Sequence, residues 1–258
     1  MPVPDLKHQA VGRAQGGLLV QVCDTPAIML MARDADLDFV FFDCEHGVIP
    51  YDHLHDLMLM GNEMGIPSLV RAGQLARVDV SRILDFGAAG VMVPMMETAE
   101  QAELLVAWSK YPPLGRRSYS GGGSTAYGPS GGHSTNMAAA NDLVMAIAQI
   151  ETVEGCANAE AICSVEGIDA VIVGPCDLAI SLGTPDDVDT EREAELIDQV
   201  AKAAHAHGCL FGIIGGNAML ARHADEVDLM VSAIDTHLLR GALATSEADY
   251  DSIRADAR

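Results

Sequence analysis

Basic residues are scarce in this chain of 258 residues, with 15 Lys and Arg against 37 Asp and Glu and a formal net charge of -22. Such a surface repels phosphates, which argues against binding to a nucleic-acid backbone. The sequence also lacks the roughly 18 consecutive apolar residues of a membrane span, and its first residues contain no apolar run that could serve as a signal peptide. We therefore expect a cytoplasmic protein with no nucleic-acid or membrane partner. Its acidic surface is compatible with a salt-rich host.

Cysteine and lysine are few, and their positions exclude several chemistries. The six cysteines form no CxxC pair, so neither a disulfide framework nor a zinc knuckle is indicated, and most should be small buried apolar residues. Of the lysines, Lys7 precedes the first expected strand, Lys110 is expected on a surface turn and Lys202 lies in an expected helix. None ends an expected strand, which argues against a Schiff-base enzyme.

The 49% hydrophobic content excludes a disordered chain, and short apolar runs alternate with amphipathic stretches. This alternation predicts an α/β fold, a single (β/α)8 TIM barrel over residues 1–258, with an open doubly wound sheet as the alternative. A Gly/Ser-rich segment at 109–143 is expected to be a long loop. The expected strands are 17–22, 39–43, 68–72, 90–94, 144–150, 170–174, 210–214 and 229–234, and the expected helices are 26–35, 50–64, 76–86, 98–108, 153–164, 189–207, 217–225 and 238–254.

Polar side chains at the carboxyl ends of the expected strands are the candidates for chemistry, because barrel active sites lie at that face. Glu151 and Asp177 follow neighbouring strands and could hold a hard divalent cation. Arg71 could stabilise a developing oxyanion, and His46 could transfer protons near neutral pH. The complete set is Asp43, Glu45, His46, Arg71, Gln149, Glu151 and Asp177.

Each of these residues also has a purely structural explanation. A carboxylate just after a strand is often a helix N-cap or the partner of a nearby Arg, and Asp177 before LAISL is a plausible cap. His46 could be a structural hydrogen-bonding residue. The joint occurrence at equivalent strand ends favours an active site over these separate explanations.

The ordered motifs FFDCEHG, PSLVRA, RILDFGAAGVMVPMMETAEQAE, KYPPLGRRS, AYG, AQIET, EGIDAVIVGPCDLAISLG and HAHGCLFGI span nearly the whole chain. With these motifs the sequence resembles the HpcH/HpaI family of metal-dependent, class II pyruvate aldolases. The resemblance implies a lyase that cleaves or forms 4-hydroxy-2-oxo acids, giving pyruvate enolate and an aldehyde. Its small-molecule partners would be a keto acid and an aldehyde.

The resemblance also implies roles for residues at matching positions. Glu151 and Asp177 correspond to the ligands of a divalent ion, Mg²⁺, Mn²⁺ or Co²⁺. His46 corresponds to the general acid/base and Asp85 to the acid that raises its basicity.

The keto-acid half of the site is implied in the same way. Arg71 corresponds to the residue that stabilises the enolate oxygen, and Gln149 to a contact of the keto acid. The substrate carboxylate would be held near Gly174, Cys176 and Asp177, by backbone amides.

The family resemblance further implies a hexamer, a trimer of dimers in which C-terminal helices are exchanged between subunits. The 118–136 segment departs from the family pattern, and we expect it to border the aldehyde side. Two alternatives stay open: a condensing enzyme of the siderophore-type citrate synthase kind, acting on acyl-CoA and oxaloacetate, and a non-catalytic barrel. An acyl-CoA site needs a basic patch, for which Arg116 and Arg117 are the local candidates.

Overall fold

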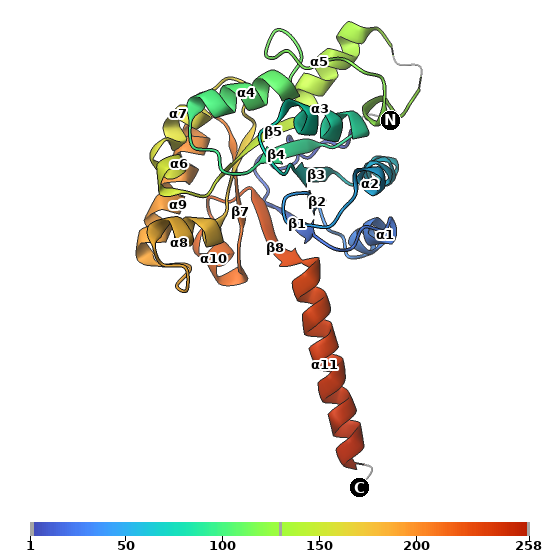
Figure 1. The fold of residues 1–258 in the computed structure, drawn as a ribbon, viewed down its shortest axis with the longest axis vertical. Coiled ribbons are helices and arrows are strands. Elements are labelled where there is room, and N and C mark those ends of the chain that lie inside the picture. Colours follow the sequence, from blue (N-terminus) through green and yellow to red (C-terminus); the bar gives the residue numbers. More distant parts are fainter. Residues whose placement is uncertain (1–2, 129–130, 257–258) are drawn as a thin grey trace.

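Eight parallel strands close into a barrel in the order of the sequence, each paired with its neighbours and β1 paired with β8 (Figure 1). The computed structural model describes residues 3–128 and 131–256. This closure confirms the predicted (β/α)8 barrel, and the open sheet was the wrong alternative. The strands are β1 (Gln15–Val20), β2 (Phe39–Asp43), β3 (Ser68–Arg71), β4 (Gly90–Val93), β5 (Met145–Ile150), β6 (Ala170–Val173), β7 (Leu210–Ile214) and β8 (Leu229–Ile234).

Helices surround the barrel and match most of the predicted positions. The helix predicted at 153–164 is divided at Asn158, and three helices were not predicted: the short one after β6 and two within 109–143. The helices are α1 (Ala27–Asp34), α2 (Tyr51–Met64), α3 (Arg77–Phe86), α4 (Ala99–Ser109), η1 (Gly123–Thr125), α5 (His133–Leu143), α6 (Val153–Ala157), α7 (Ala159–Cys163), α8 (Pro175–Leu182), α9 (Glu191–Ala206), α10 (Asn217–Arg222) and α11 (Asp235–Asp256).

The apolar side chains form two cores, as alternation along a barrel strand requires. Phe39, Phe41 and Leu69 belong to the inner core, where the N-terminal residues Val3 and Leu6 also pack. The intervening residues Val40 and Phe42 of β2 belong to the outer core, beneath the helices. Both faces of these strands are therefore buried, which explains the continuous apolar runs in the sequence.

The 109–143 segment is more ordered in structure than its composition predicts. It contains η1 and the eleven-residue helix α5, whose MAAAN run has good helix propensity. Because α4 runs back from β4 and the segment leads into β5, it lies at the amino-terminal ends of the strands of its own chain. Within one chain the segment therefore lies away from the strand carboxyl ends, and the expectation that its 118–136 part borders the aldehyde side stays a prediction.

Lys110 was expected on a surface turn, but its side chain is only 1% exposed. Its ammonium contacts Asp169 Oδ2 at 2.6 Å and donates to the carbonyl oxygens of Asn141 at 3.1 Å and Val144 at 2.5 Å. Lys7 contacts the other oxygen of Asp169 at 2.7 Å. These contacts satisfy the buried charge and tie α5 to the base of β6, away from the strand carboxyl ends.

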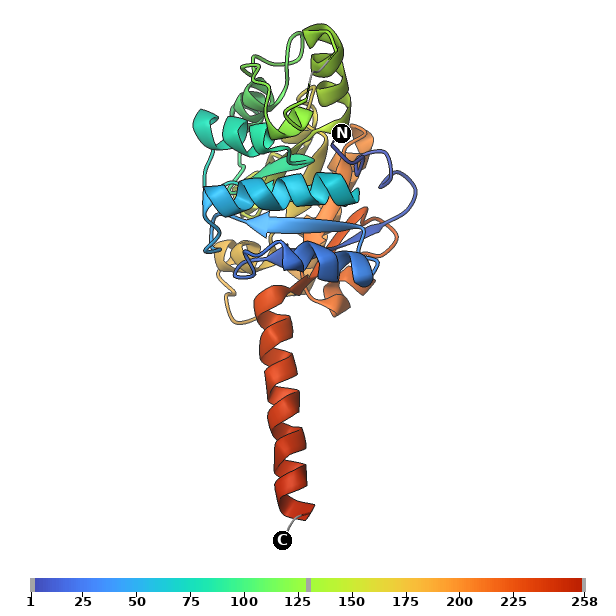
Figure 2. The ribbon, with the colours of Figure 1, turned by 90° about the vertical axis from the view of Figure 1, so that its right-hand side faces the viewer.

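The C-terminal helix α11 leaves the barrel as a separate rod in both ribbon views (Figures 1 and 2). It has 22 residues, and only its first residue, Asp235, is buried. Leu239, Leu243 and Ile253 expose large apolar side chains along it. In the part of the chain that the structure describes, no helix is long and apolar enough to cross a membrane.

The buried Lys110 gives a stability prediction. Lys110→Met leaves the Asp169 carboxylate without its main buried partner, so the free energy of unfolding should fall by about 3 kcal/mol. Equilibrium denaturant unfolding measures this change. Lys202→Met, on an exposed position of α9, is the matched control and should have little effect. Equal effects of the two substitutions would contradict the prediction.

Candidate active site

A buried ion pair between Asp43 and Arg71 lies at the carboxyl ends of β2 and β3. The parallel register pairs these two residues directly. Arg71 Nε donates to Asp43 Oδ1 at 2.9 Å and Nη2 donates to Oδ2 at 2.5 Å, a bidentate contact. Asp43 is fully buried and Arg71 is 6% exposed. The guanidinium plane is therefore set by the carboxylate beside it.

Further donors complete the hydrogen bonding of Asp43. Its Oδ1 accepts from the backbone N–H groups of Glu45 and His46 at 3.0 and 3.2 Å, and its Oδ2 accepts from Gln21 Nε2 at 3.0 Å. Burial alone would raise the pKa of Asp43, but the hydrogen bonds and charge of Arg71 outweigh it and hold the pKa below its usual value. The carboxylate is thus charged at neutral pH.

Glu151 directly follows β5 and is 2% exposed. Its Oε1 accepts from the backbone N–H of Met95 at 2.8 Å, and Gln149 Nε2 donates to its Oε2. Burial, together with the nearby charges of Asp177 and Glu45, raises the pKa of Glu151 to about 7, although the hydrogen bond from Met95 N–H and the charge of Arg71 both lower it. Glu151, Asp177 and Glu45 therefore form an acidic group, which among the described residues is offset by Arg71 and, at Glu45, by His46.

Gly174 lies against this acidic group, at the start of α8. A Cβ at Gly174 would come within 2.5 Å of Glu151 Oε2 and 2.8 Å of Gln149 Nε2, so a larger residue would displace the ends of both side chains. Cys176 is exposed and Asp177 partly exposed in the first turn of α8. Backbone N–H groups in the first turn of a helix have no partner within the helix, which favours an anion there.

His46 and Glu45 lie at the open side of the same strand ends. The His46 side chain is 60% exposed, and its Nε2 is 3.8 Å from Glu45 Oε2. Glu45 also faces Arg71, whose Nη1 is 3.2 Å away. Burial raises the pKa of Glu45, and the charge of Arg71 partly offsets the effect. The structure thus brings His46 to the rim of the group formed by Arg71, Gln149, Glu151 and Asp177.

Asp85 is the expected site residue that does not join the others. It lies near the end of α3, about 12 Å along the helix axis from Arg77, where the helix begins. Its carboxylate accepts from Arg117 Nη2 at 2.8 Å. Within one chain Asp85 therefore does not meet His46, because α3 carries Asp85 toward the opposite end of the barrel, and its role beside a His46 stays a prediction.

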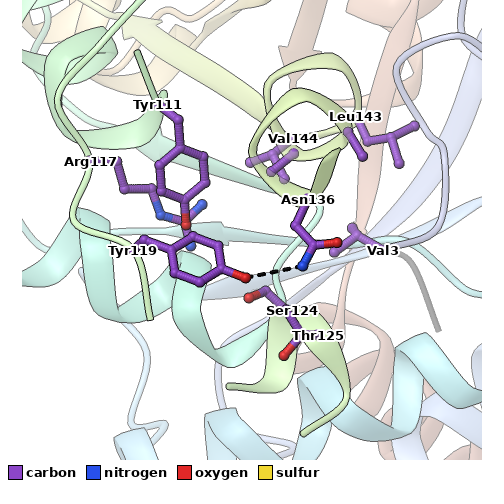
Figure 3. Close-up of a pocket in the computed structure, with 11 residues that line it drawn as sticks. Val3, Tyr111, Arg117, Tyr119, Ser124, Thr125, Asn136, Leu143 and Val144 are labelled. Carbon is purple, nitrogen blue, oxygen red and sulfur yellow. Dashed lines mark hydrogen bonds between the residues drawn. The ribbon is translucent and has the colours of Figure 1, made fainter. Parts of the chain in front are cut away.

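A cavity of about 260 Å³ adjoins Arg117 at that opposite end (Figure 3). Tyr119 lies beside Tyr111 and directs its hydroxyl toward Asn136 of α5, which donates to it at 3.0 Å (Figure 3). The Arg117 guanidinium lies 4.9 Å from the Tyr111 ring centroid. None of the site residues expected from the sequence lines this cavity.

A second cluster of possible metal ligands lies on the outside of the barrel. Within residues 3–128 and 131–256, the tightest such group of three is Asp198, His223 and Glu226, with ligand atoms within 4.8 Å of one another. His223 Nδ1 contacts Asp198 Oδ1 at 2.9 Å. Glu45, Glu151 and Asp177 are more widely spaced than this, although they face the same strand ends.

Several residues of the site were not assigned from the sequence. Asp43 and Glu45 were candidates as strand-end carboxylates but had no assigned role, and their positions three and one residues before His46 were the available signal. Gln21 lies just past the end of β1 in an apolar run and carried no such signal. The Met95 backbone N–H that binds Glu151 is a main-chain group, which no residue type reveals.

Comparison with known proteins agrees with this geometry. The sequence model of the HpcH/HpaI aldolase/citrate lyase family matches residues 19–240. The chain is 36% identical to a hydroxypyruvate/pyruvate aldolase of Rhizorhabdus wittichii over 220 residues, 83% of this chain and 85% of the relative. It is 31% identical to a 2-keto-3-deoxy-L-rhamnonate aldolase of Salmonella paratyphi B, covering 87% of this chain and 85% of the relative.

Solved structures give the same assignment. An HpcH/HpaI aldolase from Desulfitobacterium hafniense superposes with a TM-score of 0.90 at 29% identity, covering 95% of each chain. The citrate synthase SbnG has a TM-score of 0.86 at 27% identity, covering 96% of this chain and 98% of the other. The fold and site define a TIM-barrel enzyme of the aldolase, or carbon–carbon lyase, class. The chain belongs to the HpcH/HpaI aldolase/citrate lyase family, as the sequence predicted.

The raised pKa of Glu151 predicts a pH dependence of stability. The folded, metal-free protein holds a proton on Glu151 up to a pKa of about 7, whereas the unfolded chain releases it near 4.5. Burying the ionised group therefore costs stability increasingly as the pH rises between about 5 and 8. Glu151→Gln removes this cost, so its melting temperature relative to wild type should rise across that range in EDTA.

Thermal unfolding monitored by circular dichroism would measure this difference. Glu103→Gln, at an exposed position of α4, provides the control. A Glu151→Gln difference that stays constant with pH would contradict the prediction.

Proposed function

We propose that this protein is a metal-dependent aldolase that cleaves or forms 4-hydroxy-2-oxo acids, with pyruvate enolate and an aldehyde as the products of cleavage. The observation that carries the proposal is the Arg71 guanidinium, held on buried Asp43 and facing a group of carboxylates at the strand ends. The positively charged Arg71 is thus fixed beside carboxylates that could bind a metal cation. Two positive charges at this place would stabilise the negative charge of an enolate.

The acidic group has the donor chemistry for a divalent cation. Glu151 and Asp177 would hold it, and oxygen ligands of this kind suit Mg²⁺, Mn²⁺ or Co²⁺. The absence of a side chain at Gly174 leaves room beside Glu151, and none of the residues that the structure describes donates a hydrogen bond to the buried Gln149 Oε1. When bound, the cation would supply a Lewis acid for the carboxylate and keto oxygens of the substrate.

The chain's own residues would carry out the remaining steps. His46, open to solvent at the rim, would take the proton from the C4 hydroxyl as the C3–C4 bond breaks and the aldehyde forms. Arg71 would stabilise the negative charge on the enolate oxygen. Protonation of the enolate carbon then gives pyruvate.

The keto acid would be oriented by groups on β5 and α8. Gln149 would contact it, and the backbone amides near Gly174, Cys176 and Asp177 would bind its carboxylate at the start of α8. Because these contacts use backbone groups, an exposed Cys at position 176 is compatible with them.

We further propose that Asp85 serves His46 of a second chain. Asp85 lies far from the His46 of its own chain, beside the 109–143 segment, so its proposed role requires an interface. A single barrel domain over residues 1–258 would assemble as a hexamer, a trimer of dimers with α11 exchanged. The exposed leucines of α11 supply an apolar surface for that exchange. The 118–136 segment would then border the aldehyde side of a neighbour's site.

A condensing enzyme is the second candidate, favoured by the likeness to the citrate synthase SbnG. It would need a basic patch for the CoA phosphates. Of the local pair, Arg117 has a side chain only 1% exposed and is bound to Asp85, which leaves Arg116. The aldolase is therefore the better supported function.

The first test is metal dependence. After EDTA treatment, a panel of 4-hydroxy-2-oxo acids should release no pyruvate, and adding Mg²⁺, Mn²⁺ or Co²⁺ should restore release, measured with a lactate dehydrogenase couple. Glu151→Gln should abolish the restored activity, because it removes a charged ligand. Oxaloacetate decarboxylation and the Glu103→Gln variant serve as controls. Activity that survives EDTA, or no metal-dependent release from any substrate, would rule out the proposed mechanism.

Subunit mixing tests the role of Asp85. His46→Ala and Asp85→Ala chains, each defective alone, should regain activity when refolded together, because some sites would combine the intact His46 of one chain with the intact Asp85 of another. Initial rates of pyruvate release measure the recovery, and analytical ultracentrifugation checks assembly. A mixture no more active than its parents would show that the two residues do not act across an interface.

A further inference from the structure

The turn after β1 is fastened to the first residue of α11. The Asp235 carboxylate accepts from the backbone N–H groups of Gln21 at 3.1 Å, Val22 at 2.9 Å and Cys23 at 2.8 Å. Thr236 N–H donates to it at 2.7 Å. Asp235 is 3% exposed, so these bonds are protected from water. One buried carboxylate thereby fixes the backbone on both sides of Gln21.

The Gln21 side chain then spans the distance from α11 to the buried ion pair. Its Oε1 accepts from the hydroxyl of Thr236 at 3.4 Å, and its Nε2 donates to Asp43 Oδ2 at 3.0 Å. The two ends of the amide thus have different partners, which fixes its orientation. Gln21 itself is only partly buried, so packing alone gives no reason for this placement.

Asp43 transmits the constraint to Arg71. Its Oδ2 accepts from both Gln21 Nε2 and Arg71 Nη2, and its Oδ1 accepts from Arg71 Nε. A bidentate pair is coplanar, so a rotation of the carboxylate would turn the guanidinium with it. The backbone N–H groups of Glu45 and His46 hold only Oδ1 of Asp43. Gln21 holds Oδ2 and so opposes the rotation from the other oxygen.

We infer that Asp235 and Gln21 are positioning residues for Arg71, acting through Asp43. The inference rests on the proposed function, in which Arg71 stabilises the enolate. Neither residue need contact the substrate. The helix α11 departs from the barrel (Figure 2). Because Asp235 is its first residue, the hydrogen-bonded series Asp235, Gln21, Asp43 and Arg71 also links the start of that helix to the active site.

The test is a pair of double-mutant cycles on metal-supported pyruvate release. Gln21→Met and Asp235→Asn are each made alone and together with Arg71→Lys, which keeps the charge but loses the bidentate geometry. Each single variant should lower kcat about 10-fold with little change in KM, as residues that support a catalytic group do. In the Arg71→Lys background the same substitutions should change kcat less than about 2-fold.

Asp38→Asn is the matched control. Asp38 accepts from Gly16 N–H at 2.9 Å and Arg13 Nη1 at 3.0 Å near the start of β1, so it secures the opposite end of the same strand. This control should leave kcat unchanged. Equal losses of kcat in the wild-type and Arg71→Lys backgrounds would indicate general loosening of the barrel and would overturn the inference.

A crystal structure of Gln21→Met gives a readout that does not depend on activity. The bidentate contact between Arg71 and Asp43 should be lost or rotated, whereas an unchanged contact would overturn the inference. A wild-type enzyme that releases no pyruvate with any metal would refute the proposed function instead. The two failures are therefore distinguishable, and the crystal structure still decides the positioning role in that case.

Discussion

The bidentate ion pair of Asp43 and Arg71 is the interaction on which the rest of the site depends. Removing two charges from water is costly, and a buried pair is tolerated only when the remaining hydrogen-bonding positions are filled. Here backbone N–H groups and the Gln21 amide fill them. Loss of either partner would leave an uncompensated charge among apolar strands. The pair therefore constrains both the orientation of Arg71 and the turns that follow β1 and β2.

Electrostatics at the strand ends are arranged around that fixed cation. Glu151 is buried so deeply that its pKa is about 7, while Asp43, equally buried, is held ionised by Arg71. The difference arises from the partner and not from burial, since Glu151 has a backbone N–H where Asp43 has a guanidinium. Asp43 is paired with Arg71, whereas Glu151 forms no ion pair with any of the described residues. An unpaired carboxyl group in this position is suited to binding a further cation.

The two ends of the barrel have different tasks. At the carboxyl ends of the strands the polar groups converge on an open face. At the amino-terminal ends, Lys110 and Asp169 form a buried contact, and Arg117 holds Asp85 beside the 109–143 segment. Composition misled the prediction here: Gly and Ser around α5 indicated a loop, although its alanines favour a helix, and the KYPP turn indicated exposure for a lysine that is buried.

The barrel, the family and most of the strand-end residues could be predicted from the amino-acid sequence. A strand buried on both faces is a continuous apolar run, and the polar residue that follows such a run is easily recognised. Tertiary structure decided which of these residues meet. The strand register pairs Asp43 with Arg71, and Asp235 contacts the turn after β1, although these residues are far apart in the chain. The length of α3, in contrast, keeps Asp85 away from His46. Local patterns record the periodicity of each element, whereas such contacts depend on how the elements close into a barrel.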